Sequence, residues 1–538
     1  MRLTLVDANA RAYERRWWVL GVLCMSLLIV FVGNSSLNVA IPTLARDLHA
    51  SESELQWVVA SYSLVFAGLL FSTGAIGDRF GRKGALQFGL VTFFVGAAAA
   101  SQSTAMWQLI ACRALMGAGA AFIMPSTLSI LVNVFPARER AKAIAIWAAT
   151  TGAAGAIGPV ASGWLLGHFW YGSIFLINLP IILLALVGGY FLVPKSRDPE
   201  QGALDPVGAI LSIVGVSTLV YALIEAPDKG WGAPMTLGAF VISAVVLTLF
   251  VVWELHVDEP MLDIRYFRNP SFSTGSGGMM LVFLSMFGVM FLMTQYFQLV
   301  LGYSPLGAAI RLLPMAPIMI IVSPLTPRLT ARFGANRTVA FGMLCIAGGL
   351  LLFFHIGLHT PYWYILMSLI PLVSGMALSM SPMTAAIMSA VPARRAGAGS
   401  AMNDATRELG AAFGVAVLGS IAASQYTSAL RGVNHLSAAA RATARSSIAG
   451  ALHVAEGLGA VAGRALTFSA RTAFVDGIHV AVICGAVLAS IAAFVTYRYL
   501  PHVLAPEGAL HGPIESLEDT VELGLGGVPP AFADEYAQ

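Results

Sequence analysis

Ionisable side chains are rare inside the long apolar stretches of this chain, and the few present could bind protons or charged solutes. Arg113 lies in one such stretch, and Glu225 lies at the end of another. Asp404, Arg407 and Glu408 share a third, at spacings of three and four residues. A charge at the centre of a bilayer costs at least about 2.5–3.5 kcal/mol, so such residues are functional candidates by default. We therefore expect these five residues to include those that couple solute movement to proton movement.

Each of these candidates has a structural alternative. Arg113 could be a hydrogen-bonding arginine, and Asp404, Arg407 and Glu408 could form a satisfied ion-pair network along one helical face. The apolar stretches of 17–193 and 272–389 hold no deeply placed carboxylate. Proton coupling would then need an unusual carrier, and a neutral or anionic cargo is favoured over a dicationic one.

Polar and flexible side chains in the same stretches could line a substrate pathway. Buried amides and hydroxyls in hydrocarbon need partners, and thioethers adapt to varied apolar ligands. Helix packing explains the methionines equally well, and an arginine near a span end can extend to the interface. The candidates for pathway contacts are Asn34, Ser35, Asn38, Tyr62, Met290, Gln295, Gln298 and Arg311.

A short glycine-rich basic segment separates two of the apolar stretches. Residues 74–83 read Gly-Ala-Ile-Gly-Asp-Arg-Phe-Gly-Arg-Lys, with one carboxylate at Asp78. The glycines permit a tight turn between two helices, and Arg79, Arg82 and Lys83 favour a cytoplasmic position. We expect a conformational role for Gly74, Asp78, Arg79, Gly81, Arg82 and Lys83, with Asp78 joining two parts of the protein; capping of the turn is the alternative.

Composition independently places the chain in the membrane. Of 538 residues, 57% are hydrophobic and 11% charged, and the mean hydropathy is +0.79. Segments long enough to cross about 30 Å of hydrocarbon recur along the chain. We predict an all-α integral membrane protein with fourteen spans, at 17–41, 55–77, 85–103, 107–131, 143–166, 172–193, 208–226, 235–255, 272–300, 308–328, 338–358, 362–389, 397–424 and 477–499.

Positive charge predicts the orientation. Most of the 30 Lys and Arg residues fall in segments on the side of the N-terminus, which predicts that both termini are cytoplasmic. Residues 1–16 form a cytoplasmic segment, and 501–538 form an acidic tail that we expect to be disordered. The outer loop 425–476 is rich in Ala and Arg and could hold one or two amphipathic surface helices. We expect a bacterial inner-membrane protein.

An internal repeat predicts the architecture. Arg79-Phe80-Gly81 recurs as Arg332-Phe333-Gly334, and Pro136-Ala137-Arg138 recurs at nearly the same spacing as Pro392-Ala393-Arg394. The repeat implies two six-helix halves, 17–193 and 272–500, with a helix pair and linkers inserted at 194–271. Chance matching of tripeptides is the alternative.

The residues of 74–83 resemble the signature between helices 2 and 3 of the major facilitator superfamily. Leu37–Pro42, Gly158-Pro159, Asn178-Leu179-Pro180 and Arg407–Gly410 are similar to elements of its fourteen-helix drug:proton antiporters, the EmrB/QacA type. The resemblance implies export by alternating access, with Gly158 and Pro159 in a gating span. The chain departs from the family at Gly33–Ser36, where many members carry an acidic residue.

Together these features predict a secondary exporter of amphipathic small molecules. Its energy source would be the proton gradient, without a cofactor or metal, and its partners would be the substrate, protons and the lipid bilayer. We find no metal-ligand spacing, nucleophile motif or phosphate-binding loop, so an enzyme is not expected. A net charge of +3 does not suggest nucleic-acid binding, and a monomer is expected. A dedicated exporter of a neutral or anionic metabolite or lipid, and a non-transporting receptor, are the alternatives.

Overall fold

The computed structural model describes residues 14–196, 205–258, 260–391, 396–430, 433 and 435–502. The regular elements of that part are all helical, and fourteen of its helical segments are long and apolar enough to cross a membrane. This confirms the predicted fold class. The first 13 residues, the acidic tail from 503 onward and the repeat at Pro392–Arg394 lie outside the described residues.

We describe the helices as a first half, an inserted pair and a second half. The first half contains α2 (Arg16–Asp47), α3 (Glu52–Phe80), α4 (Arg82–Ser101), α5 (Met106–Val134) and α6 (Ala137–His168), and its sixth span is made of α7 (Ser173–Leu176) and α8 (Asn178–Leu192). The inserted pair is α9 (Pro206–Lys229) and α10 (Pro234–His256).

The second half begins after a short turn of helix, η1 (Ile264–Arg268). It contains α11 (Pro270–Gln295), which continues into the π-helical turn η2 (Tyr296–Val300), then α12 (Pro305–Leu312), α13 (Met315–Val322), η3 (Ser323–Leu325), α14 (Thr326–Phe333), α15 (Ala335–Phe353), α16 (Tyr362–Ser389), α17 (Ala396–Ala429), α18 (Ala438–Ser446), α19 (Ile448–Glu456) and α20 (Ala460–Tyr499).

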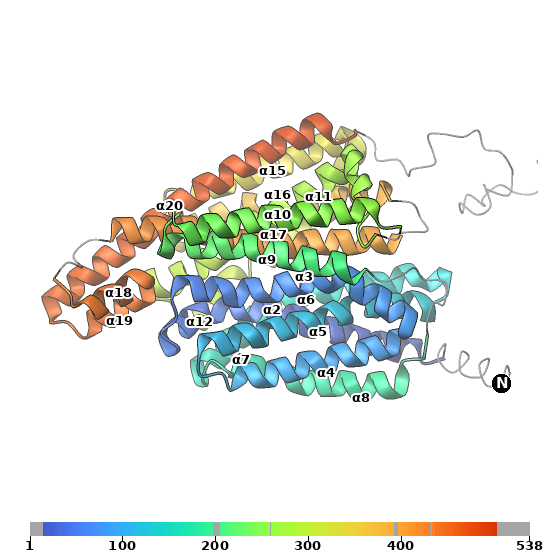
Figure 1. The fold of residues 1–538 in the computed structure, drawn as a ribbon, viewed down its shortest axis with the longest axis horizontal. Helices are drawn as coiled ribbons and strands as arrows, with labels where there is room; N and C mark the ends of the chain where they lie inside the picture. The colour runs from blue at the N-terminus through green and yellow to red at the C-terminus, as the bar shows by residue number, and fades with distance from the viewer. Residues whose placement is uncertain are drawn as a thin grey trace, which may run out of the picture.

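Figure 1 shows the helices lying side by side, with the first half below and most of the second half above. We call the end that carries the turn of residues 74–83 the motif end; it is on the right of Figure 1. The opposite end, where α18 and α19 project, is the loop end. Helix α2 begins at the motif end and α20 finishes there, so the described chain starts and stops on one side of the bundle.

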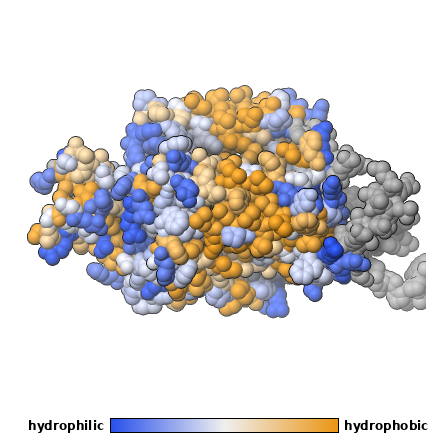
Figure 2. Space-filling view, turned by 90° about the horizontal axis from the view of Figure 1, so that it is seen from below, coloured by the Kyte–Doolittle hydropathy of each residue, from blue (hydrophilic) through white to orange (hydrophobic). Residues whose placement is uncertain are grey.

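The surface has the polarity that a bilayer requires. Large apolar side chains are exposed along α8 and α10, including Leu184 at 62%, Phe191 at 72% and Val241 at 62%. Figure 2 shows apolar residues gathered across the middle of the molecule and hydrophilic residues towards both ends. An exposed apolar surface of this extent in the middle of a helical bundle is the surface that faces lipid tails.

The last helix is longer than predicted. It begins at Ala460 rather than at residue 477, so much of the predicted loop 425–476 is helical. Alanine has the strongest helix propensity, and this segment is rich in alanine without being apolar enough to register as a span. The loop does hold two short helices, as predicted. Helix α19 packs against α2 and α20, with Ile448, Ala449 and Ala451 buried, and α18 packs against α19 and α17.

The tenth span is divided into α12, α13, η3 and α14. Pro314 precedes α13, Pro324 lies in η3, and Pro327 lies at the start of α14. Proline lacks the N–H that would continue the backbone ladder, so three prolines within one span break it into short pieces. The sequence predicted a span at 308–328, and the structure has one at Pro305–Phe333, which these prolines divide into short helical pieces.

The repeated Arg-Phe-Gly tripeptide occupies equivalent places in the two halves. Gly81 has φ of +123° between α3 and α4, and Gly334 has φ of +87° between α14 and α15. A positive φ of this kind is readily adopted only by glycine, which explains why both copies of the tripeptide retain it. This backbone equivalence supports the repeat over chance matching.

The pairing of α15 with α16 depends on a glycine at their contact. A Cβ at Gly375 would lie 2.2 Å from the carbonyl oxygen of Gly342, whereas a Cβ at Gly348 on α15 would meet nothing within 4 Å. We expect Gly375→Ala to lower the free energy of unfolding by about 1–3 kcal/mol through overpacking. Gly348→Ala is the matched control and should change it little. Thermal unfolding of the two purified variants in detergent tests this, and equal stabilities would contradict it.

Candidate functional site

Arg113 on α5 is fully buried among helices of the first half. Its Nε donates to the carbonyl of Val58 at 3.2 Å, its Nη1 to the carbonyl of Gly33 at 3.3 Å, and its Nη2 to Oδ1 of Asn34 at 3.3 Å. Each of the three nitrogens of the guanidinium therefore has a partner, from α2 and α3. No ion pair involves Arg113 in the described part of the chain.

The Tyr62 ring completes this environment. The Arg113 guanidinium carbon lies 4.3 Å from the Tyr62 ring centroid, a cation–π arrangement, and the Tyr62 hydroxyl donates to the carbonyl of Val30 at 3.4 Å. Helix α5 reaches this close because Gly117 has no side chain, since a Cβ there would lie 2.4 Å from the Tyr62 carbonyl. Arg113, with none of its side chain exposed, thus joins α2, α3 and α5.

Glu408 links this cluster to the second half. Its Oε2 accepts a hydrogen bond of 2.7 Å from Ser63 on α3, next in sequence to Tyr62. The link to Arg113 runs through Tyr62, whose ring lies 4.3 Å from the Arg113 guanidinium carbon. The Glu408 side chain is partly buried. We call Asn34, Tyr62, Ser63, Arg113 and Glu408 the central polar cluster.

Glu408 lies 12 residues into α17, roughly 18 Å along the helix. The sequence placed it at one end of a local ion-pair network. Asp404 and Arg407 do pair, at 3.7 Å, but Glu408 instead bonds to the opposite half. The coupling role of Glu408 stays a prediction, and the structure adds its hydrogen-bond partner on α3. Periodicity along α17 could not indicate a partner on α3.

Four further hydrogen bonds join the halves nearer the loop end, and one of them runs from Ser447 Oγ to the carbonyl of Ala50 at 3.3 Å. Gln295 Nε2 donates to Glu52 Oε1 at 2.9 Å, and Gln298 Nε2 donates to the carbonyl of Val39 at 2.9 Å. Ser420 Oγ donates to Gln56 Oε1 at 3.3 Å. Two of the pathway candidates, Gln295 and Gln298, thus hold the halves together in this conformation.

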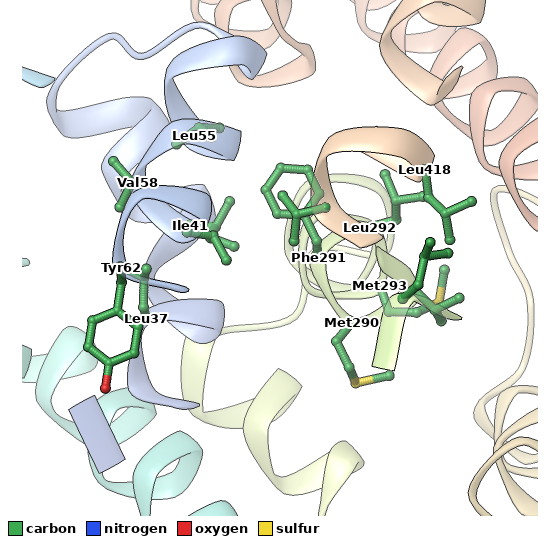
Figure 3. Close-up of a cluster of buried hydrophobic side chains, with 14 of the residues drawn as sticks. Leu37, Ile41, Leu55, Val58, Tyr62, Met290, Phe291, Leu292, Met293 and Leu418 are labelled. Atoms are coloured by element: carbon green, nitrogen blue, oxygen red, sulfur yellow. The ribbon is translucent and has the colours of Figure 1, made fainter. Parts of the chain in front are cut away.

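Apolar packing reinforces this closure. Figure 3 shows Leu37, Ile41 and Leu55 of the first half opposite Phe291 and Met290 of α11. These side chains belong to one buried cluster that spans both halves. Because both hydrogen bonding and apolar burial join the halves here, the loop end is closed in this conformation.

The motif end differs. No hydrogen bond joins α2–α8 to α11–α20 at that end within the described residues. A Cβ at Gly152 or Gly155 on α6 would meet nothing within 4 Å, so none of the described helices approaches α6 closely at these glycines. Nearer the loop end α6 does contact its neighbours, since a Cβ at Gly158 would lie 2.1 Å from Ser35 Oγ. Pro159 follows Gly158 within the same helix.

Asp78 has its partners within its own half. Its Oδ1 accepts from Arg82 Nε at 2.5 Å and from Ser129 Oγ on α5 at 3.1 Å. Lys83 Nζ donates to the carbonyl of Tyr190 at 2.6 Å, which ties the turn to α8. Among the described residues, Asp78 makes no hydrogen bond or ion pair with the second half, so the contact between halves that we predicted for it is not seen there.

The contacts of the remaining turn residues, Arg79 and Gly74, are local. Arg79 is exposed with its guanidinium 5.7 Å from the Phe80 ring centroid, and a Cβ at Gly74 would make an ordinary contact of 3.7 Å with Pro125.

The other predicted site residues are spread along the bundle. Asn38 is one turn from Asn34 on α2, is partly exposed and has no hydrogen-bond partner among the described residues. Ser35 Oγ donates to the carbonyl of Ala154 at 3.3 Å. Glu225 accepts from Trp57 Nε1 at 3.3 Å and pairs with Lys229 at 3.1 Å, at the loop end of α9. Arg311 lies 3.7 Å from the Tyr303 ring centroid, near the loop end of the second half.

Sequence reasoning missed Ser63 and Glu52. Serine is common in membrane helices, so Ser63 carried no signal of its own. Glu52 lies just before the predicted second span, in the Ser-x-x-Glu segment that caps α3. An acidic residue at a helix start is explained by capping, so the sequence did not indicate its bond to Gln295. Within the described residues, no group of three or more His, Cys, Asp or Glu side chains could hold a metal ion.

Comparison with known proteins decides the family. Residues 23–415 match the family described as Major Facilitator Superfamily. The chain belongs to this superfamily. It is therefore a multi-pass membrane protein of a transporter family and not an enzyme.

Two relatives align over most of their length. The chain is 36% identical to the multidrug efflux pump LfrA of Mycolicibacterium smegmatis, over 91% of this chain and 97% of the relative. It is 34% identical to the methyl viologen resistance protein SmvA of Salmonella typhimurium, over 86% and 93%.

Among solved structures, the fold is similar to a bacterial homologue of the human lysosomal transporter Spinster. That structure was solved in an inward-facing, unoccupied conformation. The TM-score is 0.66 at 18% identity, covering 91% of this chain and 99% of that one. The likeness supports the superfamily fold assigned from sequence.

The three-way bonding of Arg113 predicts that lysine cannot replace it. Arg113→Lys keeps the charge but loses the forked donors, so we expect the free energy of unfolding to fall by about 1.5–3 kcal/mol. Arg337→Lys, at an exposed site on α15, is the control and should be neutral. Denaturation of both variants in detergent measures the difference; a neutral Arg113→Lys would show that these bonds contribute little.

For Asp78, removal of the charge tests a role beyond capping. Asp78→Asn keeps an acceptor oxygen for Arg82 and Ser129, so we expect normal membrane insertion and a transport rate at least tenfold lower. Uptake of a fluorescent cationic dye into inverted membrane vesicles measures that rate, normalised to the amount of inserted protein. Normal transport would assign Asp78 to the turn alone.

Proposed function

We propose that this protein exports amphipathic small molecules across a bacterial inner membrane by alternating access, in exchange for protons. Residue Glu408 would carry the proton. The observation that carries the proposal is the 2.7 Å hydrogen bond from Ser63 of the first half to Glu408 of the second, beside the buried charge of Arg113. It couples the protonation of one carboxylate to the contact between the two halves.

The conformation supports alternating access. The halves are joined near the loop end by four hydrogen bonds and an apolar cluster, and they lack hydrogen bonds at the motif end in the described residues. Positive charge in the sequence places the motif end in the cytoplasm, together with both termini. In this assignment the structure is inward-facing, and the opposite state requires the loop-end bonds to break.

Proton exchange at Glu408 supplies the coupling. The ionised carboxylate accepts from Ser63, which favours contact between the halves at mid-bundle. Protonation weakens that contact, and a cationic cargo can compete with the proton for the same carboxylate. A single group that binds either the proton or the cargo, but not both, is sufficient for exchange in opposite directions.

The geometry also revises the expected cargo. Each nitrogen of Arg113 donates to the protein, so the arginine does not need an anionic ligand. Glu408 is the carboxylate of the central polar cluster, and Asn38 is a partly exposed polar group on the same part of α2. These features favour cationic or neutral amphiphiles over the anionic metabolite considered from sequence. The names of LfrA and SmvA, a multidrug pump and a methyl viologen resistance protein, support this cargo class and the EmrB/QacA type of antiporter.

Glu408→Gln tests the carrier. In proteoliposomes with an imposed pH gradient, the wild type should release lumenal protons when a cationic amphiphile is added, and this variant should lose at least 90% of that signal. Glutamine keeps the size and an acceptor for Ser63, so the loss would report the proton itself. Glu14→Gln, at an exposed site at the motif end, is the control and should behave as the wild type. Proton movement that persists in Glu408→Gln would remove Glu408 as the carrier.

A further inference from the structure

A cavity lies at the loop end, well away from the central polar cluster. Its volume is about 280 Å³. Arg46 in its wall is 12 residues beyond Asn34 on α2, a distance of roughly 18 Å along the helix. The polar side chains around it come from five helical elements: Arg46 of α2, Gln298 of η2, Thr443 of α18, His453 and Glu456 of α19, and Arg471 of α20.

The cavity is positively charged. Arg46 and Arg471 carry two positive charges, against one carboxylate at Glu456, and no ion pair joins that carboxylate to either arginine in the described part of the chain. Arg46 Nε donates to the carbonyl of Pro42 at 3.3 Å, and Arg471 Nε donates to the carbonyl of Leu299 at 3.0 Å. These bonds hold both guanidinium groups in place, and their terminal nitrogens have no hydrogen-bond partner among the described residues. Planar guanidinium groups of this kind suit phosphate and carboxylate oxygens.

A buried amide oxygen without a hydrogen-bond donor among the described residues also lines the cavity. Gln298 is 8% exposed, its Nε2 donates to Val39, and its Oε1 is buried without a hydrogen-bond partner. An unsatisfied buried acceptor costs free energy, and a ligand that brings a donor removes this cost. The ligand that fits therefore has an anionic group and a hydroxyl or amine close to it.

Size and backbone geometry agree with a small ligand. A volume of 280 Å³ is just below the roughly 300–1,000 Å³ of sites for drug-sized molecules, so a headgroup fits better than a bulky cargo. His49 in the cavity wall has φ of +51°, a strained value for a side-chain-bearing residue, and its ring centroid lies 5.2 Å from that of His453. Strained backbone of this kind gathers at ligand sites.

We propose that this cavity binds a phosphate group with an adjacent hydroxyl, of the glycerol-phosphate type, either as a lipid headgroup or as a free molecule. Arg46 and Arg471 bind the phosphate, and Gln298 Oε1 accepts from the hydroxyl. Arg46 belongs to the first half, whereas Arg471 and Gln298 belong to the second. A ligand held by both halves stabilises the conformation in which the loop end is closed, because opening separates its partners.

Native mass spectrometry of the full-length protein tests the lipid source. The protein is presented with equal amounts of phosphatidylglycerol, phosphatidylmethanol and phosphatidylcholine. We expect preferential retention of phosphatidylglycerol, and about a tenfold loss of that preference in each of Arg46→Gln and Arg471→Gln. Phosphatidylmethanol has the same charge without the hydroxyls, so it should be retained less. Arg464→Gln, at an exposed site on α20 outside the cavity, should match the wild type.

Equilibrium dialysis with radiolabelled glycerol 1-phosphate, in phosphatidylcholine nanodiscs, tests the soluble source. Binding that is lost in Arg46→Gln and Arg471→Gln, without preference for phosphatidylglycerol, assigns the site to the free molecule. Absence of binding to the wild type in both experiments overturns the proposal, as does an equal loss in Arg464→Gln. If the two cavity variants unfold, the lipids retained by the wild type provide the test. Equal retention of phosphatidylglycerol and phosphatidylmethanol by the wild type contradicts the proposed site.

Discussion

A charged side chain inside a bilayer must find its partners within the protein, and Arg113 is where this requirement acts most strongly. Its guanidinium is fully buried and takes acceptors from the carbonyls of Gly33 and Val58 and the amide of Asn34. Satisfying it places α2, α3 and α5 at fixed positions in the first half. The close approach at Gly117 and the stacked Tyr62 ring follow from the same requirement.

The departure from the superfamily pattern at Gly33–Ser36 has a structural counterpart. Where many drug:proton antiporters carry a carboxylate, Asn34 supplies a neutral oxygen to Arg113. The arginine keeps its positive charge without a counter-ion on α2. The carboxylate of the central polar cluster comes instead from the second half. Glu408 lies on α17 and bonds to Ser63 of α3, so this carboxylate is located at the contact between the halves.

The two ends of the bundle use different interactions. Near the loop end, amides and carboxylates bond across the halves, and α18 and α19 add a further layer through the bond from Ser447 Oγ to the carbonyl of Ala50. At the motif end, Asp78, Arg82 and Lys83 bond within the first half. A transporter that closes each end in turn needs contacts that can break, and hydrogen bonds between rigid halves can break without unfolding any helix.

The sequence by itself determined the class, the number of spans, the repeat and the superfamily. These depend on local composition and on short motifs, because a span needs only enough apolar residues in a row, and the turn at Gly81 needs only a glycine. The start of the alanine-rich α20 and the breaks at the prolines of the tenth span were not predicted. The length of an apolar stretch and the helix propensity of its residues are different properties.

Only the tertiary structure decided which polar groups meet. Ser63 and Glu408 are 345 residues apart, and Glu52 and Gln295 are 243 apart. No periodicity along one helix shows which face of another helix lies opposite, because packing of the whole bundle sets that geometry. For this reason Arg113 and Glu408 could be nominated from their charge in an apolar segment, whereas their place in one polar cluster could not.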